Sequence, residues 1–253
     1  MVSIVIPVHN AENFIGDTIR SCMAQSFRDW ELLLVNDHSE DASEEIMRSL
    51  IEECHDRGLT NDIRILQVEE GHGAAIARNT GIRAAKGRFI AFLDADDVWE
   101  PEKLEEQMGF IEDNKAAFSF TGYEFADETG IGIDKIVHVP ERMTYSQALK
   151  NTTIFTSTVI FDTSILDKKL IEMPDVPSED TATWWKVLKS GYTAYGLDRP
   201  LTLYRRSGNT LSSDKGKAIR RIWNLYRNVE KLSPMKSAWC FLHYAVHATA
   251  RRI

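Results

Sequence analysis

The chain has 253 residues, of which 43% are hydrophobic and 27% charged, a composition typical of a soluble globular protein. Its formal net charge of −8 argues against a nucleic-acid partner, because neutralising phosphates requires a basic surface. The three cysteines have no CxxC spacing, so the sequence predicts neither a disulfide framework nor a zinc site.

The charge is distributed unevenly along the chain. From Lys215 to the C-terminus there are nine Lys or Arg residues and one Glu, so this segment carries about +8 and residues 1–214 carry about −16. No apolar stretch reaches the roughly 20 residues that a membrane-spanning helix needs, and no basic segment precedes the first apolar run. We expect a cytoplasmic protein whose basic C-terminus contacts either an anionic surface, such as the inner face of the cytoplasmic membrane, or its own acidic body.

Residues 1–115 alternate apolar runs with helical patterns. One of these predicted helices would begin with a capping box formed by Asp41 and Glu44, and another predicted helix spans 74–85. This alternation predicts an α/β fold with a mainly parallel sheet flanked by helices, its strands buried on both faces. The predicted strands are the apolar runs 3–8, 31–37, 63–68 and 88–94.

The pattern is less regular after residue 115. Residues 178–191 predict a helix with Ser178 at its N-cap, acidic residues in its first turn and a glycine at its end. Two further helical segments close the chain. The other elements that we expect are strands at 116–125 and 157–161, a turn at Gly130 and Gly132, and a short helix capped by Thr144 and Gln147.

Polar side chains follow the predicted parallel strands, where ligands bind in such sheets. Like charges packed together disfavour the ionised state unless a cation lies among them, and Mg²⁺ or Mn²⁺ prefers carboxylate oxygens. We therefore expect a metal and diphosphate site with Asp96 as the better ligand, and Asp94 either sharing the metal or binding a ribose. The alternative is an acidic turn that caps the next helix. The strand-end residues are His9, Asn10, Asp37, Asp94, Asp96 and Asp97.

Four further residues have two interpretations each. Asp37 could accept hydrogen bonds from the N–H edge of a base or belong to a helix-capping loop, and Arg78 could reach an anion or be solvated. Glu179 and Asp180 begin a helix, where acidic residues complement the dipole, but an ionised carboxylate there could also act as a base. The stretch GHGAAI lacks the third glycine of a dinucleotide fingerprint and follows the wrong strand for one.

Four separated stretches resemble the family 2 glycosyltransferases, which are inverting enzymes of the GT-A fold. Their order and spacing agree with that family over about residues 1–205. The stretches are SIVIPVHN, VNDHSEDAS, GAAIARNTGIRAAKGRFIAFLDADDVWEPEKL and SEDTATWWKVL. Two later segments, YRRSGNTLSSDK and YRNVEKLSPMKSAWCFLHYAVHA, are similar to teichuronic-acid-type and capsule or lipopolysaccharide sugar transferases of bacteria. We expect a GT-A domain at 1–212, with a nucleotide-binding half at 1–115 and an acceptor-binding half at 116–212, then a basic helical extension at 213–253.

The resemblance implies roles for single residues. Asp180, in the ED motif of the family, would be the catalytic base, with Glu179 beside it orienting the acceptor. Asp94 and Asp96 would form the DXD pair that holds Mn²⁺ or Mg²⁺, and Asp37 would pair with the uracil edge. The residues implied in nucleotide binding are Pro7, Val8, His9, Asn10, Asp37, Arg78 and Asp94.

Two sets of residues concern the acceptor and the diphosphate. Trp184 and Trp185 follow the ED motif by one turn, where one could stack on a sugar or both could pack in the core. Many family members have a His after the last core strand, but this chain has Arg205-Arg206-Ser207-Gly208. Because a guanidinium suits phosphate oxygens, we expect Arg205 or Arg206 to contact the diphosphate, and the third metal ligand stays open.

The resemblance predicts an inverting, metal-dependent glycosyltransferase of the hexosyltransferase type. It would move a sugar from a nucleoside diphosphate donor, best matched by a UDP-sugar, to a saccharide or lipid-linked saccharide in bacterial cell-surface polysaccharide synthesis. One alternative is a sugar nucleotidyltransferase, which the lack of a glycine-rich N-terminal loop disfavours. Another is a non-catalytic saccharide-binding protein, which the intact DXD and ED motifs disfavour.

The last 40 or so residues carry a separate hypothesis, in which basic and aromatic side chains dock on anionic lipid. The alternative is that the aromatic side chains pack on the body of the protein. The basic residues are Arg220, Arg221, Arg227, Lys231 and Lys236, and the apolar ones are Trp239, Phe241, Leu242 and Tyr244.

Overall fold

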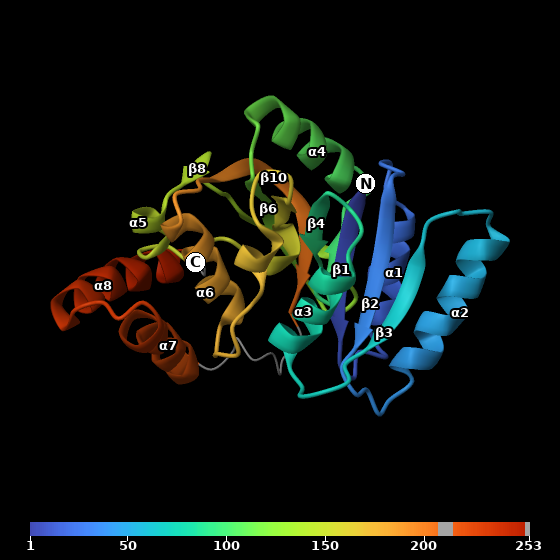
Figure 1. Cartoon of the computed structure of the whole chain (residues 1–253), viewed down its shortest axis with the longest axis horizontal. Helices are drawn as coiled ribbons and strands as arrows, with labels where there is room; N and C mark the ends of the chain where they lie inside the picture. The colour runs from blue at the N-terminus through green and yellow to red at the C-terminus, as the bar shows by residue number, and fades with distance from the viewer. Residues whose placement is uncertain (207–214, 251–253) are drawn as a thin grey trace.

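The structure, a computed structural model, describes residues 1–206 and 215–250. Ten strands in these residues form one mixed sheet with the order β3-β2-β1-β4-β9-β6-β10-β5, and β7 and β8 pair with β6 and β10 (Figure 1). The strands are β1 (Val2–Val8), β2 (Trp30–Asn36), β3 (Ile63–Gln67), β4 (Phe89–Phe92), β5 (Val98–Trp99), β6 (Phe118–Ala126), β7 (Gly132–Val137), β8 (Arg142–Met143), β9 (Ile160–Asp162) and β10 (Ala194–Arg205).

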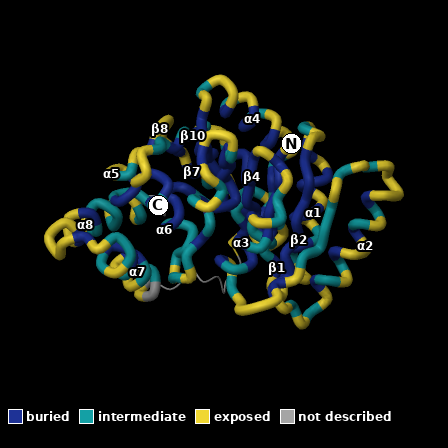
Figure 2. The backbone as a smooth tube through the Cα atoms, viewed as in Figure 1, coloured by how far each residue is buried: buried dark blue, intermediate teal, exposed yellow. Residues whose placement is uncertain are grey.

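Helices cover both faces of this sheet. The helices α1, α2 and α4 bury their apolar sides against one face, and α3, α6 and the C-terminal helices pack on the other (Figures 1 and 2). The helices are α1 (Ile15–Met23), α2 (Ser43–Asp56), α3 (Ala74–Ala84), α4 (Lys103–Asn114), α5 (Tyr145–Ala148), α6 (Glu179–Lys189), α7 (Lys215–Asn224) and α8 (Pro234–Ala250). Shorter helical turns are η1 (Thr156–Thr158), η2 (Lys168–Ile171) and η3 (Leu225–Val229).

The four predicted N-terminal strands are confirmed and run parallel, with β1 between β2 and β4 and with β3 at the edge. Their carboxyl ends therefore meet on one side of the sheet. Helix α3 lies very close to β1 because Gly81 has no side chain: a Cβ there would come within 2.3 Å of Val5. This close packing fixes α3, and with it Arg78, over the ends of the strands.

The predicted capping box at the start of α2 is wrong. The helix begins at Ser43, so Asp41 lies before the N-cap residue Ala42, and its carboxylate accepts from the Ser43 N–H at 3.0 Å. The Glu44 carboxylate instead accepts hydrogen bonds from Asn36 and Gln67 at the ends of β2 and β3. The second expected capping box, of Thr144 with Gln147 on α5, is confirmed.

The second half of the sheet differs from the expectation at two strands. Ser157 lies in the turn η1, and β9 begins only at Ile160, where it pairs antiparallel with both β4 and β6. No bounds were predicted for strand β10, because the exposed residues Asp198 and Arg199 and then Pro200 interrupt its apolar pattern. The pairing of β10 with β6 also shifts register on both sides of Pro200. Since β9 joins β4 to β6, the sheet is continuous across residue 115, and the predicted division into two halves stays a prediction.

The C-terminal helices pack on the body through part of their surface. The Tyr226 ring stacks on Trp185 of α6 with centroids 5.3 Å apart, and the Tyr226 hydroxyl donates to the Leu149 carbonyl. The Glu230 carboxylate accepts from the Tyr145 hydroxyl and forms an ion pair with Lys189 at 2.7 Å. Among residues 1–206 and 215–250, no helix combines the length and apolarity that crossing a bilayer requires.

Candidate active site

A pocket of about 430 Å³ lies at the carboxyl ends of β1, β2 and β4. It gathers, from four separate stretches of the chain, every residue predicted to bind the nucleotide or the metal. Its lining residues are Pro7, Val8, His9, Asn10, Ala11, Phe14, Asp37, Gly73, Ala74, Arg78, Asp94, Ala95 and Asp96. The roles assigned to these residues stay predictions, but the geometry places them around one cavity.

Asp37 lines this pocket with only one of its two carboxylate oxygens hydrogen-bonded. Its Oδ2 accepts from the Gly73 N–H at 2.7 Å, and its Oδ1 is buried without a hydrogen-bond partner among the described residues. Gly73 has φ 107°, a conformation that side chains disfavour, and so can aim its N–H at Asp37. Asp37 therefore binds the turn before α3, and an N–H donor on a ligand would satisfy the remaining oxygen.

The loops after β1 and β2 are tied together at the rim of the pocket. The His9 Nδ1 lies 2.7 Å from the carbonyl oxygen of Asp37, and the Asn10 side-chain oxygen accepts from the Glu40 N–H at 2.8 Å. Asn10 adopts φ 49°, which asparagine tolerates better than most residues. These contacts hold the two loops together at the rim of the pocket.

Arg78 connects the pocket to the ED motif. Its side chain is buried, donating from Nη2 to Asp94 at 2.5 Å and from Nη1 to Glu179 at 2.7 Å. Burial alone would lower the pKa of Arg78, but the charges of Asp94 and Glu179 more than offset it, and the guanidinium stays charged. The solvated alternative for Arg78 is thus excluded by the structure.

The three aspartates after β4 have different environments. Asp97 is fully buried, where its Oδ2 accepts from the Ser157 hydroxyl at 2.5 Å and its Oδ1 from the Arg205 N–H at 3.2 Å. Burial, then the charges of Asp96 and Asp94, raises the pKa of Asp97 well above its usual value. Only Asp94 and Asp96 of the cluster line the pocket.

The electrostatics of the pair Asp94 and Asp96 fit a divalent cation. Burial, followed by the charge of Asp94, raises the pKa of Asp96 to about 6, although Arg205 and Arg78 act in the opposite direction. A cation bound between the two carboxylates would favour their ionised forms. The described residues contain no group of three or more His, Cys, Asp or Glu side chains placed to bind a metal. The pair would thus need further ligands from water or a diphosphate, as is usual for Mg²⁺.

Helix α6 carries the predicted base in its first turn. The Asp180 Oδ2 accepts from the Thr156 hydroxyl at 3.1 Å, and its Oδ1 accepts from the Thr181 N–H at 2.6 Å. Burial raises the pKa of the neighbouring Glu179, whose carboxylate is engaged by Arg78. Ser178 stands at the N-cap as expected, but it has φ 63° and its side chain makes no capping bond.

Of the two alternatives for Trp184 and Trp185, the structure shows packing in the core. Trp184 is 2% exposed and packs against the rings of Phe92, Phe118 and Phe161 at centroid distances of 5.4–6.1 Å. Trp185 is 1% exposed and stacks on Tyr226. Both residues lie on the side of α6 that faces the sheet and the C-terminal helices, so they anchor the helix that carries Asp180.

The two arginines after the last strand lie apart. Arg205 is 2% exposed, pairs with Asp17 at 3.2 Å and lies over the ring of Phe14, which lines the pocket. Arg206 is exposed, with its guanidinium over the ring of Phe125. Ser207 and Gly208 lie outside the described residues, and the diphosphate contact expected of either arginine stays a prediction.

The turn η1 was not predicted to belong to the site. Its Thr156 binds Asp180, while the Ser157 hydroxyl donates to Asp97 and accepts from the Asp94 N–H at 3.0 Å. One short turn therefore positions the aspartate cluster and the predicted base together. No sequence signal indicates this, because the partners are 24 to 63 residues away along the chain.

Replacing Ser157 with alanine is expected to lower the free energy of unfolding by about 1–3 kcal/mol, because a buried oxygen of Asp97 loses its donor. Urea titrations at an unchanged m-value would measure the loss. Ser146→Ala, at an exposed position on α5, is the matched control and should stay within about 0.5 kcal/mol of the parent. Equal stabilities for the two variants would contradict the role of Ser157.

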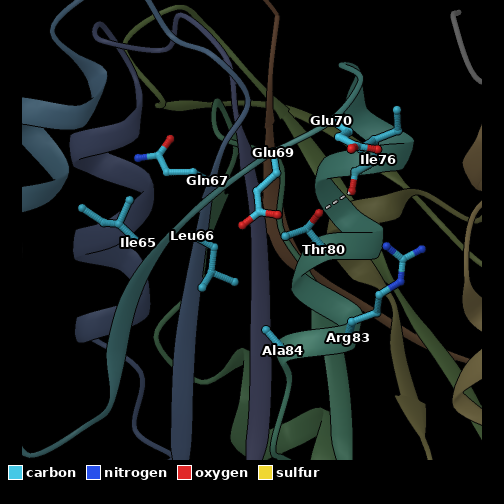
Figure 3. A pocket seen from close by; sticks show the side chains of 9 residues that line it. All are labelled: Ile65, Leu66, Gln67, Glu69, Glu70, Ile76, Thr80, Arg83 and Ala84. Atoms are coloured by element: carbon cyan, nitrogen blue, oxygen red, sulfur yellow. Dashed lines mark hydrogen bonds between the residues drawn. The ribbon is translucent and has the colours of Figure 1, made fainter.

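A second hollow, of about 720 Å³, lies between the edge strand β3 and helix α3 (Figure 3). It is open to solvent and is lined by both polar and apolar side chains. At its wall, the Thr80 hydroxyl donates to the Ile76 carbonyl on α3. None of the predicted nucleotide, metal or base residues lines it. The lining residues are Ile65, Leu66, Gln67, Glu69, Glu70, Ile76, Thr80, Arg83 and Ala84.

Comparison with known sequences identifies the class of enzyme to which this site belongs. The sequence profile of glycosyl transferase family 2 matches residues 3–172, which include the pocket and the aspartate cluster. The chain belongs to this family. The predicted enzyme class is confirmed: the protein is a glycosyltransferase, and the nucleotidyltransferase alternative is set aside.

Two relatives match this glycosyltransferase over almost its whole length. TuaG of Bacillus subtilis (strain 168), named for teichuronic acid biosynthesis, is 41% identical over 254 residues, 100% of this chain and 98% of its own. WfgD of Escherichia coli is 35% identical over 247 residues, 97% of this chain and 92% of its own. Its name describes a UDP-Glc:alpha-D-GlcNAc-diphosphoundecaprenol beta-1,3-glucosyltransferase. The predicted resemblance to bacterial cell-surface sugar transferases is confirmed.

Two solved structures share the fold. Staphylococcus aureus TarS 1–349, in complex with UDP-GlcNAc, superposes with a TM-score of 0.68 at 20% identity, covering 98% of this chain and 71% of the TarS 1–349 chain. The mannosyltransferase PcManGT from Pyrobaculum calidifontis, in complex with GDP-Man and Mn²⁺, gives 0.66 at 20% identity, covering 98% and 74%. These likenesses confirm the predicted GT-A fold.

Proposed function

We propose that this glycosyltransferase moves a sugar from a UDP-sugar, with a divalent cation and inversion at the anomeric carbon, to a hydroxyl of a lipid-linked saccharide. The observation that carries the proposal is the Arg78 bridge, which joins Asp94 in the pocket to Glu179, next to Asp180. A donor bound at Asp94 would thereby lie beside the predicted base. The naming of WfgD as an enzyme for a diphosphoundecaprenol acceptor supports the acceptor class.

Different residues of the pocket would bind different parts of the donor. Asp37 would accept the N3–H of uracil through its unpartnered Oδ1, and the ends of β1 and β2 would flank the nucleoside. Asp94 and Asp96 would hold Mn²⁺ or Mg²⁺, which when bound offsets the negative charge of the departing diphosphate. A UDP complex of the TarS neighbour supports a uridine donor, although PcManGT was captured with GDP-Man.

Asp180 would act on the acceptor. Its carboxylate takes the proton of the attacking hydroxyl while the acceptor oxygen bonds to the anomeric carbon, and the carbon–oxygen bond to the diphosphate breaks with its electron pair staying on UDP. Attack from the face opposite the leaving group inverts the configuration. Thr156 and the Thr181 N–H hold the two carboxylate oxygens, so that Asp180 is oriented before the acceptor binds.

The setting of the reaction follows from the proposed acceptor. A lipid-linked saccharide stays in the membrane, so the enzyme would work at the inner face of the cytoplasmic membrane, in contact with it but not crossing it. The naming of TuaG for teichuronic acid biosynthesis supports a role in making a bacterial cell-surface polysaccharide.

Asp37→Asn is expected to weaken UDP binding by about tenfold or more, because a hydrogen bond to a charged acceptor contributes about 1.5–3 kcal/mol. Calorimetric titration of UDP in the presence of Mn²⁺ would measure the change. Glu40→Gln, an exposed substitution three residues further along the same loop with the same charge change, should bind UDP as the parent does. Unchanged affinity in Asp37→Asn would overturn the nucleobase role, and no UDP binding by the parent would overturn the proposed donor.

A further inference from the structure

The C-terminal helix α8 exposes an apolar stripe along its outer side. The stripe consists of Met235 (84% exposed), Trp239 (57%), Leu242 (61%) and Val246 (63%). Their spacing of four, three and four residues puts all four side chains on one side of the helix. Water-exposed apolar side chains in such a row are unusual for a surface without a partner.

The opposite side of α8 faces the protein. Cys240 is buried, and Phe241 and Tyr244 pack against the core, so the aromatic residues predicted to act together are divided between two faces. The Trp223 ring of α7, itself 40% exposed, meets Phe241 edge-on at 6.1 Å. Helices α7 and α8 form one end of the molecule (Figures 1 and 2). The stripe side chains are exposed there, while Cys240 on the other side of α8 is buried.

Charge favours one kind of partner for this end. Residues from 215 on carry about +8 and residues 1–214 about −16, and Arg220, Lys231 and Lys236 are exposed there. A second copy docked through the same stripe would bring two strongly positive segments together. An anionic lipid surface would instead attract this end and repel the acidic body, which also sets the orientation of the protein.

We propose that the α8 stripe is a membrane-docking surface that lies in the plane of an anionic bilayer, with Trp239 at the level of the headgroups. Amphipathic helices bind in this way when an apolar row is accompanied by basic residues, and Trp favours the interface. The inference rests on the proposed function in one respect: a lipid-linked acceptor would require the enzyme to work at a membrane surface. It would place the enzyme where such an acceptor is found.

Co-sedimentation of the full chain with lipid vesicles tests the proposal. The parent is expected to bind vesicles that contain phosphatidylglycerol, to bind phosphatidylcholine vesicles much less, and to be released by high salt. The variant W239E/L242E should lose at least about tenfold in partitioning, because two charges replace the apolar contact. Met235→Glu, at the most exposed position of the stripe, gives an independent variant that should also weaken binding.

A matched control changes exposed apolar residues elsewhere. I131E/I133E alters Ile131 and Ile133, which are 67% and 51% exposed near β7, and introduces the same charge without touching the stripe. This variant should partition as the parent does after allowance for net charge. If I131E/I133E lost as much binding as W239E/L242E, the effect would be one of net charge and the stripe would not be the docking surface.

Three results would overturn the proposal. They are a parent chain that stays in the supernatant with both kinds of vesicle, a W239E/L242E variant that still binds, and a parent dimer in light scattering that W239E/L242E converts to a monomer. The last result would assign the stripe to a second copy of the chain. UDP titration of each variant separates this proposal from the donor site, because W239E/L242E is expected to retain the UDP affinity of the parent.

Discussion

Replacing Asp180 with asparagine is expected to lower kcat by about 10²–10⁴-fold, the usual contribution of a general base. The amide keeps the size of the side chain and can still accept from the Thr156 hydroxyl, which lies 3.1 Å from Oδ2. It cannot take a proton from the acceptor, so turnover should fall while UDP affinity stays unchanged. Steady-state kinetics with a saccharide acceptor, together with UDP titration, measure both quantities.

The control for this variant is Asp175→Asn, which makes the same charge change at an exposed position just before α6. It should have kcat close to that of the parent. If Asp180→Asn kept more than a tenth of the parent turnover, Asp180 would not be the base. A matching loss of UDP affinity would show instead that the substitution disturbs α6 and, through Glu179 and Arg78, the donor pocket.

The contacts of the two adjacent carboxylates are the reason to expect the base at Asp180 and not at Glu179. Glu179 accepts from Arg78 at 2.7 Å, and this guanidinium is already shared with Asp94. Taking up a proton would break the ion pair of Glu179 with Arg78, although burial raises the pKa of Glu179. Asp180 accepts only from neutral donors among the contacts described, so we expect Asp180, and not Glu179, to take the proton of the acceptor.

The half of the fold that forms the donor pocket could be predicted from sequence because its signals are local. Strands buried on both faces read as unbroken apolar runs, as in β1 and β2, whose seven residues are all or nearly all buried. Parallel strands must then end at the same edge of the sheet. That single rule predicts that Asn10, Asp37 and Asp94 lie close together, and the pocket contains all three.

The side-chain contacts that connect the donor pocket to α6 and η1 could not be predicted, because they join residues far apart in the chain. Arg78 and Glu179 are 101 positions apart, and Ser157 and Asp97 are 60 apart. The two tryptophans of α6 show the same limit. Periodicity cannot distinguish a Trp at a ligand from a Trp in the core, and only the neighbouring rings of Phe92, Phe118 and Tyr226 decide it.

Asp96→Asn is expected to reduce UDP affinity in the presence of Mn²⁺ by about 100-fold or more. Substituting a residue that only supports a metal ligand typically lowers metal affinity by about 10–100-fold, so substituting a ligand itself should lower it at least as much. The same substitution should have the opposite effect once the metal is chelated. With EDTA present, Asp96→Asn should bind UDP at least as well as the parent, because it removes a negative charge that would repel the diphosphate.

Calorimetric titrations of UDP with Mn²⁺ and with EDTA, for both proteins, supply the four affinities. Asp113→Asn, at an exposed position of α4, carries the same charge change and should follow the parent in both conditions. A metal ligand should lower the UDP affinity on substitution when Mn²⁺ is present and not when EDTA is present. A residue that only supports the shape of the pocket should lower it in both conditions. A variant weakened equally with Mn²⁺ and with EDTA would have a damaged pocket. A variant that binds UDP as tightly as the parent in the presence of Mn²⁺ would remove Asp96 from the metal site and leave Asp94 without its predicted partner.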